Sequence, residues 1–134
     1  MDWSIEFDQS HGIIRTSQSG SFSLAEQASF LTDIFRSPHW KNGLPLLMDY
    51  SDVIVTSIGY VDLTAVGSFL TTFRPRLGPG KIALLCDDDE KFGLGRQFQI
   101  MCEADIGREI RIFRDEAEAI AYLTADKSVH ISAS

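Results

Sequence analysis

The sequence predicts an α/β fold in which a mixed, mostly parallel sheet begins with an N-terminal hairpin and carries helices packed on it. Residues 45–48 and 81–86 are continuous apolar runs, which are typical of strands buried on both faces of a parallel sheet. Segments with the apolar spacing of helices separate these runs. Such alternation of strands and helices favours right-handed crossovers between parallel strands.

The N-terminal elements follow from local signals. Residues 4–8 and 12–16 are short extended runs around a Gly-containing turn, which indicates a β-hairpin. Ser23 followed by Glu26 has the spacing of a capping box, so a helix is expected to begin there and to end at Pro38. The apolar face of this helix is expected to contain Leu24, Ala28, Leu31 and Phe35.

The remaining elements repeat this alternation. Asp62 is expected to cap a second helix with the apolar face Leu63, Val66, Leu70 and Phe73, which stops at Pro75. Residues 81–86 are expected to form a central strand. Residues 90–104 are expected to form a helix, and residues 109–113 a strand nearer an edge. Asp115 and Glu118 have the spacing of another helix start. In summary notation we write the order as ββαβαβα.

Composition excludes several classes of function. The formal net charge is −7 and the twelve basic residues are scattered, so the basic face that nucleic-acid binding needs is missing. We expect no nucleic-acid partner and no membrane insertion, because no stretch approaches the ~20 apolar residues of a span. No signal peptide is recognised, and Cys86 and Cys102 are expected to be buried thiols of a cytoplasmic protein. We expect one domain over residues 1–134, with a flexible polar tail at 127–134.

Several motifs carry a resemblance to a known family. They are 81–85 (KIALL), 92–98 (FGLGRQF), 110–115 (IRIFRD), Ala119-x-x-Tyr122-Leu123, Gly20-x-Phe22-Ser23 and 47–50 (LMDY). With these motifs the chain, from about Ile13 to Leu123, resembles the SpoIIAA-like proteins of bacteria. That family is related in fold to STAS domains and, more distantly, to the lipid-binding Sec14 domains. The resemblance implies a SpoIIAA/STAS-like fold, and fold alone does not carry function.

The resemblance also suggests where a phosphorylation switch would lie. In the STAS proteins that act as anti-anti-sigma factors, a serine at the start of the helix after the third strand is phosphorylated within an Asp-Ser-Ser-Gly-like motif. Residues 55–64 of this chain lack that motif. Ser57, Thr56 and Thr64 are therefore candidate phospho-acceptors by analogy only.

Polar residues are expected to gather where the parallel strands end, which is where α/β proteins of open-sheet type bind ligands. The residues of this candidate ligand or partner rim are Asp49, Tyr50, Ser51, Asp87, Asp88, Asp89, Arg96 and Arg114. The aspartates suit Mg²⁺, but Asp88 and Asp89 also stand where a helix begins and where acids cap free N–H groups. The glycines of 92–96 fit no phosphate-binding motif, and are expected to permit close approach to a strand or another chain.

We predict no catalytic site, no metal site and no cofactor, because no nucleophile–base pair or ligand spacing is present. The first hypothesis is a non-enzymatic binding module that recognises a protein partner, a homodimer included, in bacterial regulation. The second is a carrier of a small molecule or lipid, for which the chain is expected to leave little spare volume. The third is a Mg²⁺-dependent phosphoryl-transfer enzyme that uses Asp49 and residues 87–89.

Overall fold

The computed structural model describes residues 1–125, so the expected tail at 127–134 lies outside the described residues. Within that range the chain forms five strands and five helices. In order they are β1 (Asp2–Asp8), β2 (Ile13–Ser21), α1 (Leu24–Arg36), β3 (Leu46–Ile54), α2 (Tyr60–Thr72), α3 (Arg74–Leu77), β4 (Lys81–Leu85), α4 (Asp89–Ile106), β5 (Glu109–Phe113) and α5 (Glu116–Thr124).

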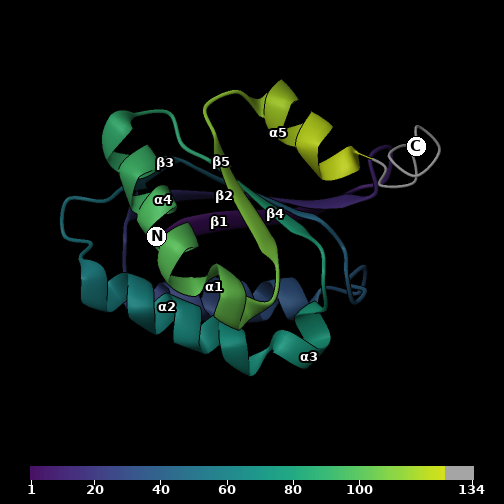
Figure 1. Ribbon diagram of the computed structural model, residues 1–134, viewed down its shortest axis with the longest axis horizontal. Helices are drawn as coiled ribbons and strands as arrows, with labels where there is room; N and C mark the ends of the chain where they lie inside the picture. Colours follow the sequence, from purple (N-terminus) through teal and green to yellow (C-terminus); the bar gives the residue numbers. More distant parts are fainter. Residues whose placement is uncertain (126–134) are drawn as a thin grey trace.

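The five strands form one sheet in the order β1-β2-β3-β4-β5. The pair β1–β2 is antiparallel, and the other neighbours are parallel. Because each crossover from β2 to β5 steps to the next strand in the same direction, right-handed connections place α1, α2 and α4 on the same face of the sheet. Helix α5 packs on the opposite face, as Figure 1 shows.

Each face of the sheet has its own apolar core. The larger core lies under α1, α2 and α4 and includes Phe30, Phe35, Leu84 and Phe98. The smaller core lies under α5 and is formed around Ile13, Leu47, Ala83 and Leu123. Strand β4 contributes side chains to both cores, as expected of a strand buried on both faces. The larger core determines where a ligand pocket can form.

The predicted fold class is confirmed, with an N-terminal hairpin, a mixed sheet and helices on it. The observed order ββαβααβαβα adds the short helix α3 and one βα unit to the summary formula. Residues 109–113 do form the strand at the sheet edge. The strand expected at 45–48 is longer than predicted, because β3 continues to Ile54 through pairing with β2.

Helix starts show which capping predictions hold. The Ser23 hydroxyl accepts a hydrogen bond from the Glu26 N–H, and the Asp115 carboxylate accepts one from the Glu118 N–H. Asp62 is not the N-cap of α2, because the helix starts at Tyr60 and the Asp62 carboxylate accepts from the N–H of the N-cap residue, Gly59. The predicted apolar face of α1 is also wrong at one end. Leu24 is 41% exposed, whereas the core side of the helix is formed by Gln27, Phe30, Leu31, Ile34 and Phe35.

Arg108 holds together the edge of the sheet at which the parallel strands begin. Its side chain is buried and donates hydrogen bonds to four backbone carbonyls, those of Leu44 (2.6 Å), Leu77 (2.7 Å), Gly78 (3.1 Å) and Lys81 (3.2 Å). Burial lowers the pKa of the guanidinium to about 10, so it remains charged at neutral pH. The carbonyl dipoles that solvate this charge therefore come from the segments just before β3 and β4 and from the first residue of β4.

Candidate ligand-binding pocket

An apolar pocket lies between the sheet and helices α1, α2 and α4, towards the carboxyl ends of β3 and β4. Its volume is about 100 Å³. Apolar side chains from both sheet and helices line it, among them Leu31, Met48, Leu63, Val66, Leu84 and Phe98. The carboxyl ends of parallel strands are the usual place for ligand sites in open α/β sheets.

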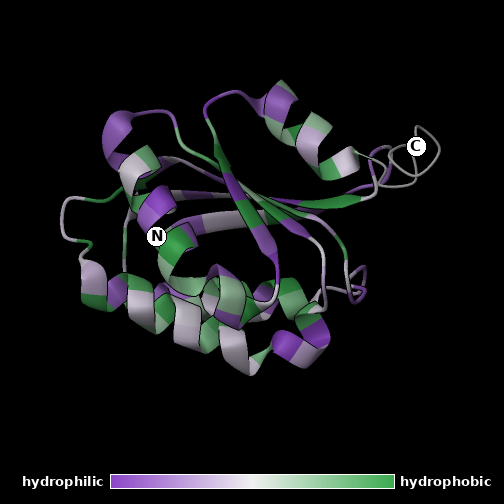
Figure 2. Cartoon of the chain, viewed as in Figure 1, coloured by the Kyte–Doolittle hydropathy of each residue, from purple (hydrophilic) through white to green (hydrophobic). Residues whose placement is uncertain are grey.

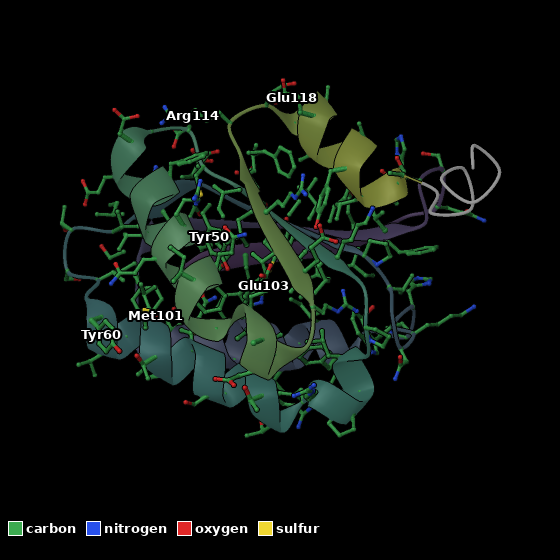
Figure 3. All side chains as sticks on the ribbon, viewed as in Figure 1. Tyr50, Tyr60, Met101, Glu103, Arg114 and Glu118 are labelled. Carbon is green, nitrogen blue, oxygen red and sulfur yellow. The ribbon has the colours of Figure 1, made fainter. Side chains whose placement is uncertain are left out.

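The period of the strands explains why these side chains converge. Met48 of β3 is paired with Leu84 of β4, so their side chains lie on the same face. Two residues further along each chain, Tyr50 and Cys86 line the same pocket. Figure 3 shows Tyr50 in this region, with Tyr60 at the start of α2. The strand alternation therefore places one hydroxyl and one thiol beside the apolar side chains of the sheet in this pocket.

A chain of buried polar side chains leads to Tyr50 from the neighbouring strand. The Gln18 Nε2 donates to Gln27 Oε1 at 2.6 Å, and the Gln27 Nε2 donates to the Tyr50 hydroxyl oxygen at 3.3 Å. Gln18 and Gln27 are buried, and these hydrogen bonds offset part of the cost of removing the amides from water, since the Gln18 Oε1 is buried without a hydrogen-bond partner among the described residues. We call these three residues the Gln18–Gln27–Tyr50 relay.

Lys91, in the first turn of α4, is the charged residue that lines the pocket. Its Nζ donates to the backbone carbonyl of Ser51, lies 2.9 Å from Asp87 Oδ1 and lies 3.3 Å from Asp88 Oδ2. Burial alone lowers the pKa of an ammonium, but the bonds to both carboxylates outweigh it and raise the pKa of Lys91. The cation is thus neutralised by protein groups.

The hydroxyl and the thiol in the pocket stay protonated. Burial raises the pKa of the Cys86 thiol to about 12, and Lys91 reduces this shift only in part. Burial also raises the pKa of Tyr50 above its ordinary value, against the hydrogen bond from Gln27. A protonated thiol is a poor nucleophile, so Cys86 lacks the activation that covalent catalysis needs.

The predicted rim does not form one surface. Asp49 and Tyr50 are successive residues of β3, so their side chains lie on opposite faces of the sheet. Asp49 lines a polar hollow on the α5 side with Ser4, Ser17 and Arg15, whereas Tyr50 lines the apolar pocket. Asp49 therefore lies on the α5 side of the sheet, and the expected approach of Asp49 to the aspartates of residues 87–89 stays a prediction.

Four other rim residues, Asp87, Asp88, Asp89 and Arg114, lie together at the start of α4. The Asp88 carboxylate caps this helix by accepting from the Lys91 N–H at 2.8 Å, which lowers its pKa. Asp89 forms an ion pair with Arg114, and the Arg114 guanidinium lies over the Phe92 ring. Figure 2 shows the first turn of α4 as hydrophilic, and the same holds for the connection from β5 to α5. Arg96 is exposed further along α4.

The candidate phospho-acceptors lie beside the pocket wall, near the start of α2. Thr56 and Ser57 are exposed in the connection between β3 and α2. Thr64 is exposed on α2, and its hydroxyl donates to the carbonyl of Tyr60 at 3.0 Å. Phosphorylation at these positions stays a prediction.

The two glycines of the FGLGR segment differ in their surroundings. A Cβ atom at Gly95 would lie 3.0 Å from Ile112 Cγ1, so this glycine lets α4 approach β5, as predicted. Nothing lies within 4 Å of the corresponding position at Gly93. A third glycine, Gly67 of α2, lies directly against Cys102 of α4.

Residues 1–125 contain neither a cluster of metal ligands nor a helix able to cross a membrane. In that part of the chain no group of three or more His, Cys, Asp or Glu side chains is arranged to hold a metal ion. None of the described helices has the combination of length and apolar character that a membrane span needs.

Sequence reasoning missed Gln18, Gln27 and Lys91. A signal for Gln27 exists, because it lies three residues after Leu24 and four before Leu31 and so interrupts a predicted apolar helix face with an amide. No comparable signal exists for Lys91 of α4, because its position depends on a hydrogen bond to the backbone carbonyl of Ser51 in β3.

Comparison with known proteins identifies the fold. The structure is similar to that of an uncharacterised protein of the DUF3478 family with a SpoIIAA-like fold from Shewanella loihica PV-4. The TM-score is 0.60 at 13% sequence identity, over 91% of this chain and 92% of that chain. No family model and no curated protein matches the sequence. The protein therefore has a SpoIIAA-like fold.

Proposed function

We propose that this protein is a binding module, without catalytic activity, whose apolar pocket takes a compact and mainly apolar small molecule. The pocket of about 100 Å³ beneath α2 and α4 is the observation that carries the proposal. A ligand that fills the pocket would gain free energy by burying its own apolar surface against this apolar lining.

The pocket volume limits the class of ligand. Apolar cavities of about 150 Å³ remain dry and bind benzene. This pocket is somewhat smaller, so it suits a single ring or a short branched chain. The more distant resemblance to Sec14 domains supports a carrier function in general, but a complete acyl chain exceeds the available volume.

Absence of catalysis is part of the proposal and is supported by the chemistry of the polar groups. The Cys86 thiol stays protonated, and Lys91 is paired with Asp87 and Asp88. Neither has the free basic neighbour that would activate it in acyl or phosphoryl transfer.

A cavity-filling variant tests the proposal. Val66 lines the pocket, so Val66→Phe should fill it, whereas Val61→Phe makes the same change at a position that is 78% exposed on the same helix. We expect benzene to shift the backbone amide resonances of the pocket residues in the wild type and in Val61→Phe, but not in Val66→Phe. Wild-type spectra that stay unchanged at the solubility limit of benzene would contradict a binding pocket.

A second candidate function is recognition of a protein partner or of a second copy of the chain. Ile54, Tyr60 and Val61 are 52%, 64% and 78% exposed, and they flank the connection between β3 and α2. Aromatic residues with exposed apolar neighbours are enriched at the centres of interfaces. Sedimentation equilibrium of the wild type and of Tyr60→Ser tests the self-association form of this hypothesis. Monomeric wild-type protein at high concentration would rule out the homodimer.

A further inference from the structure

In the Gln18–Gln27–Tyr50 relay each residue donates a hydrogen bond to the next one, and the contact of Gln18 with Met1 sets this direction. The Gln18 Nε2 lies 3.0 Å from Sδ of Met1 as well as 2.6 Å from Gln27 Oε1. A thioether sulfur only accepts hydrogen bonds, so the amide nitrogen of Gln18 must face Met1. Gln27 therefore turns its oxygen towards Gln18 and its Nε2 towards the Tyr50 hydroxyl.

This direction leaves the Tyr50 hydroxyl as a hydrogen-bond donor in the pocket, beside the weaker donor of the Cys86 thiol. The Tyr50 oxygen accepts from Gln27, so its own proton points away from the relay. Among residues 1–125 no protein atom accepts a hydrogen bond from this hydroxyl, and Tyr50 lines the pocket. Burial raises the pKa of Tyr50, which keeps the proton in place at physiological pH.

The charges near the pocket disfavour an anionic ligand. An ammonium group has three donors, and Lys91 directs them at the Ser51 carbonyl and the carboxylates of Asp87 and Asp88. A ligand carboxylate would have to displace one of these partners and then lie near the remaining aspartate. A neutral acceptor, by contrast, needs only the Tyr50 hydroxyl.

We propose that the pocket selects a neutral apolar molecule with one hydrogen-bond acceptor, such as a ketone or ether oxygen, and that the Tyr50 hydroxyl donates to that acceptor. The inference rests on the proposed function, because it specifies the chemistry of the same pocket. Tyr50 is thus a specificity-determining residue, and Gln18 and Gln27 are positioning residues that set the direction of its proton.

The test uses three ligands built on the same ring. Cyclohexanone carries the acceptor, methylenecyclohexane replaces the oxygen by a CH₂ group, and cyclohexanecarboxylate carries a charge. We expect Tyr50→Phe to weaken cyclohexanone binding about tenfold, the usual effect of losing one hydrogen bond. Methylenecyclohexane should bind the variant as tightly as it binds the wild type. Tyr60→Phe is the matched control, because it removes an exposed hydroxyl outside the pocket, and it should leave both affinities unchanged.

A measurement on the wild type alone keeps the proposal testable if Tyr50→Phe does not fold. The carbonyl stretching band of bound cyclohexanone should lie at lower frequency than in a hydrocarbon solvent, because a hydrogen bond weakens the C=O bond. A band at the hydrocarbon value would overturn the role of Tyr50.

The outcomes separate this inference from the proposed function. Equal cyclohexanone affinities in the wild type and Tyr50→Phe, with methylenecyclohexane still bound, would overturn the inference and leave the pocket intact. Tighter binding of cyclohexanecarboxylate than of cyclohexanone would overturn the preference for neutral ligands. Failure of the wild type to bind all three probes would overturn the proposed function and the inference with it.

Discussion

The close contact between α2 and α4 allows a test in which the sign of a stability change is decisive. A Cβ atom added at Gly67 would lie 2.4 Å from Sγ and 3.1 Å from Cβ of Cys102. Replacing an unhindered helical glycine by alanine stabilises a protein by about 1 kcal/mol. Overpacking a well-packed contact costs about 1–3 kcal/mol. We therefore predict that Gly67→Ala lowers the free energy of unfolding by up to about 2 kcal/mol.

The assay is urea denaturation followed by circular dichroism, with Gly93→Ala as the matched control. Gly93 is also helical and has nothing within 4 Å of the added Cβ position, so its replacement should raise the free energy of unfolding by about 1 kcal/mol. Adding Cys102→Ala to Gly67→Ala should reverse part of the loss, because it removes the nearer clashing atom. A Gly67→Ala protein as stable as Gly93→Ala would refute the assigned helix contact.

Two further predictions concern buried polar groups. Arg108→Met should lower the free energy of unfolding by about 3–5 kcal/mol in the same assay, because four carbonyls lose their shared donor, whereas the exposed Arg96→Met should change it by less than about 0.5 kcal/mol. Burial raises the pKa of Cys86 from 9.0 to about 12, so the unfolded thiol ionises first and stability falls as the pH rises above 9. In reducing buffer the loss at about pH 10 should be about 1 kcal/mol smaller in Cys86→Ala than in the wild type, because Tyr50 and Tyr122, whose pKa burial also raises, contribute equally in both; a loss of equal size in that variant would assign it to groups other than Cys86.

Much of the fold could be predicted because local signals and sheet topology agree. The acids at 115 and 118 mark a helix start, and the apolar run at 81–86 marks a strand buried on both faces, and the structure confirms both. The limits of β3 could not be read in this way. Residues 49–52 are polar, yet β2 pairs with them and keeps them extended. A neighbouring strand overrides a local pattern that resembles a loop.

The same long-range pairing explains why the site was only partly predicted. The sequence predicted that Tyr50 and the start of α4 lie at the carboxyl ends of the parallel strands, and residues of both line the pocket there. It grouped Asp49 with Tyr50, although successive residues of a strand lie on opposite faces once β3 is extended. The relay was not predicted, since it joins β2, α1 and β3 through side chains whose separation in the sequence gives no hint of contact.

The number of helices and strands predicts little spare volume in the chain, but it takes no account of how closely the helices pack. Gly67 brings α2 and α4 together on one side, and Gly95 brings α4 towards β5. The pocket is bounded by these same helices and by β3 and β4. Cavity volume depends on such contacts and cannot be obtained by counting elements.

Crystallography under xenon pressure tests the central claim, that the pocket is an accessible apolar site, most directly. Xenon binds dry apolar cavities without needing a polar group. We expect a xenon peak bounded by Leu63, Val66, Leu84 and Phe98 in the wild type, and its loss in Val66→Phe. A wild-type crystal with no xenon between these side chains would show that the pocket is not an accessible apolar site.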